Sequence, residues 1–261
     1  MQRCSVVFNL ILLLLVMSCV HNPKDKLYQI EKQHVLKVGM DARTGLPFVQ
    51  QGKDAQAYGG FEYDIAEYLA QKLGVELKLM NTPWDELLNT LKAGKIDIAL
   101  NAIERPDPPN TVEGIEFSTP YYVSSQQLIV PKKDNFIYNL SDLKKKKVGV
   151  LEASVAKALL EELNDLKKAG IILYTFPNHK TLFSELQREK LQAALTERTV
   201  ANWFSWKNKN VKLTGERILE RPYVIAVPKG EARFLNHINL ILKQAKKDKQ
   251  FNAILKKWHV V

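Results

Sequence analysis

The chain has 261 residues, of which 46% are hydrophobic and 25% are charged, and its formal net charge is +10 at pH 7. The lysines are scattered, as in DLKKKKVGV and LKQAKKDKQ, and no aromatic residues alternate with them, so they indicate a solvated surface and argue against a nucleic-acid-binding protein. Of the two cysteines, Cys4 lies in a predicted signal segment, which excludes a disulfide within one mature chain.

The N-terminus has the pattern of an export signal. Arg3 precedes an apolar run over 6–16, which at roughly 11 residues is short for a membrane span of about 20. We therefore expect a signal peptide over 1–18. The stretch ending at Cys19 resembles a bacterial lipoprotein signal, in which this cysteine carries the lipid, although an ordinary secretory peptide is the alternative. The polar residues 19–33 then read as a tether that holds a soluble domain on the periplasmic or cell-surface side of a bacterial membrane.

The remaining residues, about 225, are ample for one large domain or two lobes, and their hydrophobic periodicity alternates between strand and helix. A helix closing on Gly74 carries one apolar stripe, and another helix is predicted to open with Thr82 as N-cap and Pro83 at its first position. Because the pattern restarts after Tyr122, we expect two α/β lobes with a cleft between them. The expected strands are 35–40, 75–80, 95–103, 126–131, 147–151, 171–176, 191–197 and 223–227; the expected helices are 60–74, one from 82, 154–168, 180–189, one after 197 and two at the C-terminus.

Polar residues follow several of the predicted strands. Asp41 follows the first strand, Asn101 to Glu104 end the third, Ser154 follows VGVLE and Glu197 follows AALT. In open α/β sheets, ligands bind beyond the carboxyl ends of the strands, so these positions predict a binding cleft. Any one of these residues taken alone also fits a helix cap or a solvated loop.

Over residues 34–259 the sequence resembles the periplasmic solute-binding proteins of polar amino-acid ABC transporters. The resemblance lies in VGMDARTGLPF, YGGFEYDIAEYLAQKLG, PWDELLNTLKAGKIDIAL, FSTPYY, LKKKKVGVLEAS, LQAALTE, YVIAVPKG and FNAILKKWH, in the family's order. It implies the two-lobed type II periplasmic-binding-protein fold, with parallel or mixed sheets flanked by helices and two hinge strands near 127–131 and 223–227. Lobe 1 is then discontinuous, over 34–128 and 225–261, and lobe 2 spans 129–224.

The resemblance also implies a set of ligand-binding residues. Asp41 matches the acidic residue of the first lobe, and Phe48 and Trp84 match aromatic positions that wall the pocket, with core packing as the alternative for both. Glu197 stands where the family usually has an Asp that receives the ligand's ammonium group. Ala153-Ser154 stands where the family has Gly-Thr, so a hydroxyl group and a helix N-terminus remain available to an anion.

The sequence departs from the family after the third strand. Typical members have Ala-Gly, then a Thr or Ser, and then an Arg that grips the ligand's α-carboxylate with two hydrogen bonds. This sequence has Asn101-Ala102, Glu104 and Pro109 at those places, and sliding the alignment by two residues brings Thr111 to the Arg position. Neither alignment supplies an arginine.

Two explanations of this departure are open. Arg105 or Arg43 replaces the missing arginine and amino-acid binding is preserved, or the ligand has no α-carboxylate and presents cationic groups to Asp41, Glu104 and Glu197. Three carboxylates that face one cleft raise one another's pKa values, and a bound cation relieves this repulsion. The sequence thus favours an amine-bearing ligand, with an amino acid as its commonest kind. Internal pairing of Glu104 with Arg105 or a lysine is the alternative role for that residue.

From the resemblance we expect a monomeric receptor that captures a small polar solute, an amino acid or a related amine, by closure of its lobes and delivers it to an ABC transporter permease. No reaction, cofactor, metal or nucleic acid is implied. Two alternatives remain: an enzyme similar to cyclohexadienyl dehydratases, with Glu197 as its acid, and a sensor or scaffold that has lost ligand binding.

Overall fold

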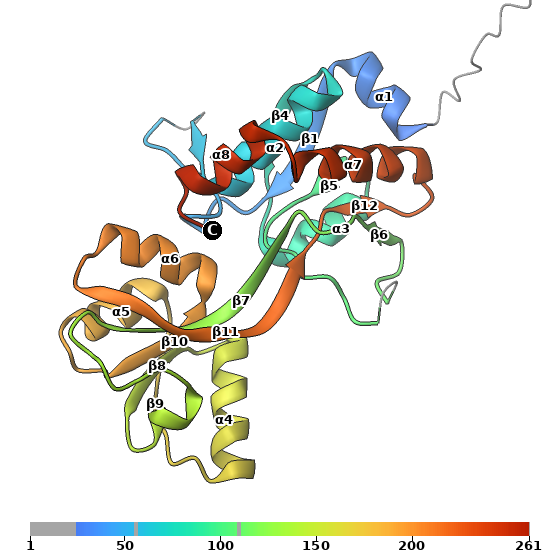
Figure 1. The fold of residues 1–261 in the computed structure, drawn as a ribbon. Helices are drawn as coiled ribbons and strands as arrows, with labels where there is room; N and C mark the ends of the chain where they lie inside the picture. The colour runs from blue at the N-terminus through green and yellow to red at the C-terminus, as the bar shows by residue number, and fades with distance from the viewer. Residues whose placement is uncertain (1–24, 55–56, 109–110, 261) are drawn as a thin grey trace, which may run out of the picture.

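The protein folds into two lobes, each built on a five-stranded sheet, in a computed structural model that describes residues 25–54, 57–108 and 111–260 (Figure 1). The strand order is β4-β1-β5-β12-β6 in the first sheet and β11-β7-β10-β8-β9 in the second. Helices flank both sheets, and parallel and antiparallel pairs occur in each. The predicted two-lobed α/β fold is therefore confirmed.

Lobe 1 contains the first sheet and draws on both ends of the described chain. The helices α7 and α8 return from the C-terminal part and lie beside α1 and α2 (Figure 1). Its elements are α1 (Lys26–Gln33), β1 (Val35–Met40), β2 (Gln50–Gln51), β3 (Tyr58–Gly59), α2 (Phe61–Leu73), β4 (Glu76–Asn81), the 3-10 turn η1 (Trp84–Glu86), α3 (Leu87–Lys92), β5 (Ile98–Ala99), β6 (Ile115–Phe117), β12 (Ala226–Pro228), α7 (Ala232–Ala245) and α8 (Lys249–Lys257).

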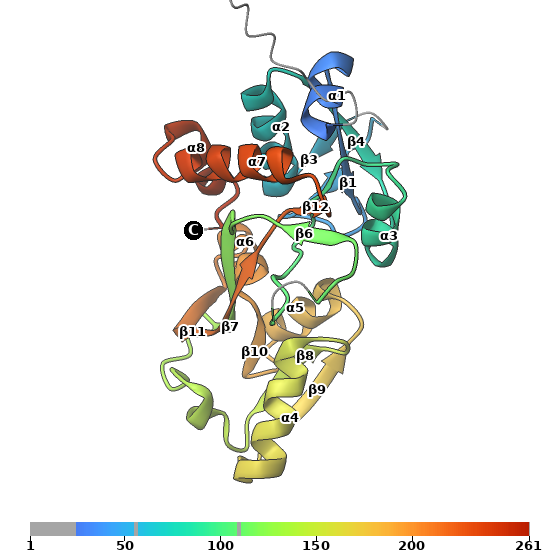
Figure 2. The same ribbon diagram turned by 90° about the vertical axis from the view of Figure 1, so that its right-hand side faces the viewer.

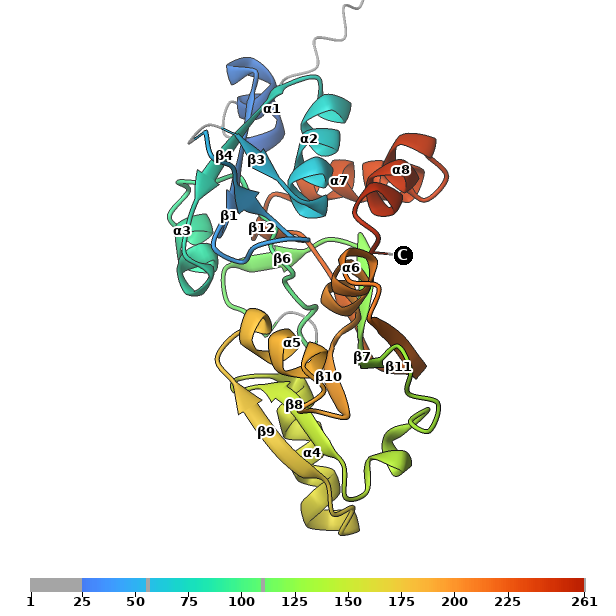
Figure 3. The same cartoon turned by 90° about the vertical axis from the view of Figure 1, so that its left-hand side faces the viewer.

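Lobe 2 contains the second sheet, in which β9 is the outermost strand on one side, at the right in Figure 2 and at the left in Figure 3. Its elements are β7 (Tyr122–Pro131), the 3-10 turn η2 (Leu140–Leu143), β8 (Lys147–Leu151), α4 (Val155–Lys167), β9 (Ile172–Phe176), α5 (His179–Gln187), β10 (Ala193–Glu197), α6 (Arg198–Lys207) and β11 (Val211–Tyr223).

The two lobes are joined by β7 and β11, which pair antiparallel and continue toward the first sheet. The crossing itself is held by backbone hydrogen bonds from Ser118 to Ile225 (2.9 Å) and from Tyr121 to Tyr223 (3.1 Å). The crossing segments thus lie nearer 118–122 than the expected 127–131. The boundaries proposed for the lobes stay a prediction, and β7 runs across the first of them.

Two local expectations about lobe 1 were wrong. Residues 26–33, expected in a polar tether, form α1, because Leu27 and Ile30 are buried against the lobe and Asp25 caps the helix. Thr82 does not cap a helix, since its hydroxyl donates to the carbonyl of Met80 and Pro83 precedes a 3-10 turn. The predicted signal peptide and Cys19 lie outside the described residues. No helix within the described ranges is long and apolar enough to cross a membrane.

Candidate functional site

The carboxyl ends of β1 and β5 bring two of the predicted site residues together. The two strands are parallel neighbours in the first sheet, with Gly39 opposite Ala99. Just beyond them, the backbone N–H of Asp41 donates to the side-chain oxygen of Asn101 at 2.6 Å, and Asn101 is fully buried. Asn101 therefore supports the loop after β1 from inside the lobe.

Asp41 has a cationic partner in the adjacent loop. Arg43 binds its carboxylate with both Nε (2.9 Å) and Nη2 (2.7 Å), and the backbone N–H of Trp84 donates to it as well (3.0 Å). The hydrogen bond from the Arg43 guanidinium is the main reason that the pKa of Asp41 is lowered. The expectation that Asp41 faces the cleft without a countercharge was therefore wrong. The guanidinium of Arg43 is in turn engaged by Asp41.

The two predicted aromatic residues have different places. The Trp84 side chain is 56% exposed, and its indole N–H donates to the carbonyl of Asn101 (3.0 Å), which fixes the ring beside the ends of the strands. Phe48 is only 5% exposed and its ring packs against Phe61, 5.5 Å away between centroids. Trp84 is thus available to a ligand, whereas Phe48 is part of the hydrophobic core.

A carboxylate that the sequence did not single out, Glu62, lies beneath the site. It comes from the first turn of α2, is fully buried, and accepts hydrogen bonds from the Ala102 backbone N–H (2.7 Å), the Asn101 amide (3.4 Å) and the Tyr121 hydroxyl. Burial raises its pKa to about 7. A glutamate in the apolar helical stripe that includes Ile65 was the signal that could have revealed it.

Glu197 ends β10 in lobe 2, at one of the strand ends that the sequence singled out. Its Oε1 accepts a hydrogen bond from Ser124 (2.8 Å). Burial raises its pKa to about 7. The hydrogen bond from Ser124 lowers this pKa, and repulsion from Glu62 and Glu104 raises it further. Two carboxylates of lobe 1 therefore act on the pKa of a carboxyl group in lobe 2.

Glu104 and Arg105 lie where the chain leaves β5 and meets the hinge. The carboxylate of Glu104 is 3.8 Å from Nε of Arg221, so its partner is neither Arg105 nor a lysine. The guanidinium of Arg105 donates to the carbonyl of Ser118 (3.2 Å), and its backbone N–H donates to Pro222 (2.9 Å). Within the described part of the chain, the buried Nε of Arg221 has no hydrogen-bond partner. No feature of the sequence pointed to Arg221.

Ser154 serves as a helix cap. Its hydroxyl accepts a hydrogen bond from the backbone N–H of Lys157 (3.1 Å) and donates to the carbonyl of Leu151 (2.8 Å). The hydroxyl group that was expected to be available to an anion is therefore already hydrogen-bonded. Ser154 has the alternative role named above for a polar residue at a strand end, that of a helix cap.

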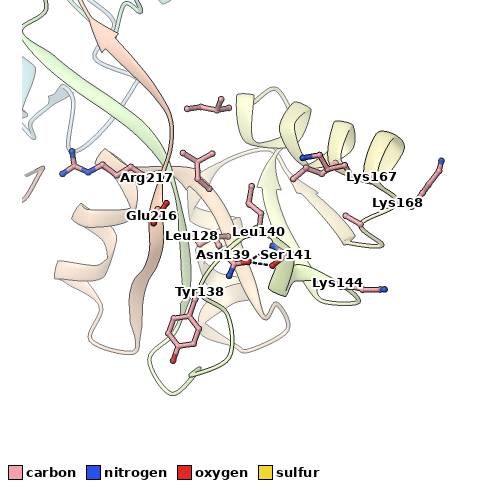
Figure 4. Close-up of a pocket in the computed structure, with 14 residues that line it drawn as sticks. Leu128, Tyr138, Asn139, Leu140, Ser141, Lys144, Lys167, Lys168, Glu216 and Arg217 are labelled. Atoms are coloured by element: carbon pink, nitrogen blue, oxygen red, sulfur yellow. Dashed lines mark hydrogen bonds between the residues drawn. The ribbon is translucent and has the colours of Figure 1, made fainter.

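Two cavities lie near these elements. One of about 580 Å³ on lobe 1 is lined by Trp84, Ala102 and Glu104, among others. A larger one of about 1080 Å³ lies on lobe 2 between α4 and β11, over an apolar floor that includes Leu128, and contains none of the predicted site residues (Figure 4). The smaller cavity is therefore the one that adjoins the site.

The raised pKa of Glu197 predicts how the glutamine variant differs from the natural protein. The pKa of Glu197 is 4.5 in the unfolded state, its ordinary value, and about 7 in the folded state. Between these two pH values the folded state holds a proton that the unfolded state releases. The free energy of unfolding then falls as pH rises through this window. Relative to Glu197→Gln, we expect the natural protein to lose roughly 2 kcal/mol between pH 4.5 and 7.5, measured by urea unfolding. A difference that does not change with pH would contradict the raised pKa of this carboxyl group.

Known proteins resemble this chain over most of its length. The model of the bacterial extracellular solute-binding proteins, family 3, matches residues 36–261. The L-cystine-binding protein TcyJ of Escherichia coli (strain K12) is 31% identical over 235 residues, which are 89% of this chain and 85% of that protein.

Solved structures similar to this chain include an ancestral cationic amino acid solute-binding protein, with a TM-score of 0.79 and 30% identity over 89% of this chain and 99% of that one. Another is an ancestral amino acid-binding protein described as a precursor of cyclohexadienyl dehydratase, with a TM-score of 0.68 and 31% identity over 90% of this chain and 99% of that one.

Proposed function

The chain belongs to the bacterial extracellular solute-binding proteins of family 3, the solute receptors of ABC transporters, and we propose that its solute is an amino acid or a related amine whose cationic group binds Glu197. The observation that carries this proposal is the acidic character of the cleft. Glu62 and Glu197 have no ion-pair partner among the described residues, and both carboxylates have raised pKa values. A cation between the lobes would relieve this repulsion.

The contacts of Arg43, Arg105 and Arg221 support a different choice of arginine for a ligand carboxylate. Arg43 is bound to Asp41, and Arg105 donates to the carbonyl of Ser118. Arg221 is also in an ion pair, with Glu104 at 3.8 Å, but its buried Nε makes no hydrogen bond within the described ranges, so it is held less closely than Arg43. For an amino-acid solute, we propose Arg221 as the residue that meets the α-carboxylate in place of the arginine that the family usually has after the third strand.

Capture follows from the arrangement of the lobes. Trp84 and Glu104 come from lobe 1, Glu197 comes from lobe 2, and the two antiparallel strands between the lobes allow them to rotate toward each other. A solute that contacts both lobes stabilises the closed form, which then presents a single surface to the permease. We also propose that the lipid on Cys19 keeps the receptor at the membrane; since α1 is folded onto lobe 1, only the residues before Asp25 serve as the tether.

The experiment that tests the proposal is thermal unfolding of the mature chain, unfolded and refolded to remove bound solute, against the amino acids, ornithine, citrulline, agmatine and common diamines. A ligand at about 100 times its Kd stabilises the folded state by roughly 2.7 kcal/mol, which raises Tm by several degrees. We expect a shift with at least one amine-bearing solute. No shift with any solute would contradict the proposal and favour the scaffold, and turnover of prephenate or arogenate would establish the enzyme.

Trp84 offers a separate prediction for the same site. We expect Trp84→Ala to weaken solute binding by roughly fivefold, because an aromatic face that contacts a cation or an aliphatic chain contributes about 1 kcal/mol. Trp84→Phe keeps an aromatic face and should retain most of the affinity, measured by calorimetric titration. Since the ring is largely exposed, neither variant should change Tm without solute by more than a degree or two. Equal affinity in Trp84→Ala and the natural protein would exclude contact with the solute.

A further inference from the structure

We infer that the free edge of β9 is a dimerisation surface, at which lobe 2 pairs with a second copy of this chain. β9 ends the order β11-β7-β10-β8-β9, so one side of its backbone has no neighbouring strand among the described residues. Exposed strand edges are sites at which other chains pair, and soluble proteins usually protect them with charged residues, proline or bulges.

β9 differs in this respect from the other three edge strands of the two five-stranded sheets. β4 carries Glu76 and Lys78, β6 carries Glu116, and β11 carries several charged residues and two irregularities in its register. From 169 to 178, around β9, the sequence AGIILYTFPN contains no charged residue in a chain of which 25% is charged. Among the four edge strands of the two five-stranded sheets, β9 is therefore the one without a charged residue; the two-residue strands β2 and β3 of the small separate sheet are also uncharged.

The backbone groups that point outward are set by the ladder with β8. Ile172 donates to the carbonyl of Lys146 and Phe176 accepts from the N–H of Glu152, both at 2.9 Å, at the two ends of the parallel pair. Because inward and outward groups alternate along a strand, Leu173 and Thr175 direct their N–H and C=O groups to the free side.

These outward groups match a second copy related by a two-fold axis. In an antiparallel pair centred on Tyr174, Leu173 of each copy lies opposite Thr175 of the other, and each such pair exchanges two hydrogen bonds. Tyr174 then lies opposite Tyr174 of the second copy at a position without backbone hydrogen bonds, where side chains are closest.

The side chains on this edge also suit the same partner. Ile172 and Tyr174 are 45% and 42% exposed, and both lie on the face of the strand that carries Phe176. Two-fold pairing places Ile172 opposite Phe176 of the second copy and aligns the two tyrosines, and such aromatic and β-branched pairs stabilise antiparallel strands. An uncharged edge forms no ion pairs with a highly charged partner, whereas the same strand of a second copy is equally uncharged.

Pairing at β9 is compatible with the receptor function. The strand lies at the opposite side of the sheet from β7 and β11, which join the lobes, so both hinges stay free in the dimer. The inference replaces the expectation of a monomer that was based on the family resemblance, and it does not depend on the identity of the solute.

The register of the pair is tested by disulfide cross-linking. The mature chain with Cys19→Ser contains no other cysteine, so an added cysteine has only its copy to react with. At the position without hydrogen bonds, Cα atoms of opposed residues are about 4.5 Å apart, within the range for a disulfide. We expect Tyr174→Cys to form a covalent dimer on mild oxidation. Ile172→Cys, whose copies would be about 14 Å apart, should not.

Mass measurement by light scattering over a dilution series tests the association itself. We expect a concentration-dependent dimer, and we expect Tyr174→Lys to raise its dissociation constant at least tenfold. Tyr138→Lys adds the same charge at an exposed tyrosine of lobe 2 away from β9 and should have no effect. Thr175→Pro removes an outward N–H and should also give a monomer, whereas Thr175→Val should not. A natural protein that is monomeric at every concentration, or equal cross-linking of Tyr174→Cys and Ile172→Cys, would overturn the inference.

Discussion

Replacing Glu197 with alanine is expected to abolish high-affinity binding of an amine-bearing solute. Loss of one partner from a buried ion pair costs about 3–5 kcal/mol, which is more than a hundredfold in Kd. The effect should appear in calorimetric titration as a weakened or undetectable interaction. Glu197→Asp restores the acidic residue usual in the family and should retain binding within about tenfold, since the carboxylate moves back by one methylene but stays in lobe 2.

The folded state of Glu197→Ala should persist without solute, because removal of a carboxylate with a raised pKa also removes repulsion from Glu62 and Glu104. Its Tm without solute should therefore be at least that of the natural protein at pH 7.5. A variant that unfolds at a much lower temperature would show that Glu197 stabilises lobe 2, and unchanged affinity in a folded variant would remove Glu197 from the site.

Replacing Glu62 with alanine is expected to lower the free energy of unfolding by about 3 kcal/mol. The Tyr121 hydroxyl and the Ala102 N–H would lose their acceptor, the Asn101 amide would keep only the Thr44 hydroxyl, and a cavity would form beside β5. Urea unfolding at pH 7 measures the difference.

Glu62→Gln is the matched control, since its amide oxygen still accepts hydrogen bonds and its volume is nearly the same. We expect it to cost less than about 1.5 kcal/mol at pH 7, where the natural carboxyl group is about half protonated. Equal destabilisation by the alanine and glutamine variants would mean that the negative charge of Glu62, and not its hydrogen bonding, supports the loop after β5.

Much of the fold was predictable because periodicity and helix ends are local signals. The helix α2 ends at Gly74 as expected, and α4 and α5 begin within a residue or two of their predicted starts. The strand β11 was not predicted, since its sequence mixes charges with apolar residues and its outer edge is exposed to solvent. The tether was misread because α1 has only two buried residues, Leu27 and Ile30, among polar ones.

The site was harder to predict than the fold, because strand ends identify positions but not the partners of a side chain. Asp41 and Asn101 lie together, as parallel strands require, yet one is paired with Arg43 and the other is fully buried. Glu62 and Arg221 come from a helix and from the unpredicted strand, and neither follows a strand end. Their approach to the cleft depends on tertiary packing, which one sequence does not reveal.

The measurement that tests the binding account most directly is calorimetric titration at pH 7 with the solute identified by thermal unfolding, in two buffers that differ in ionisation enthalpy. A carboxyl group with a pKa of about 7 is about half protonated there, so a cation that binds it displaces about half a proton per solute. We expect this release in the natural protein and a much smaller one in Glu197→Gln. Binding without proton release, with the same affinity in both proteins, would contradict the assignment of Glu197 as the residue that holds the cation.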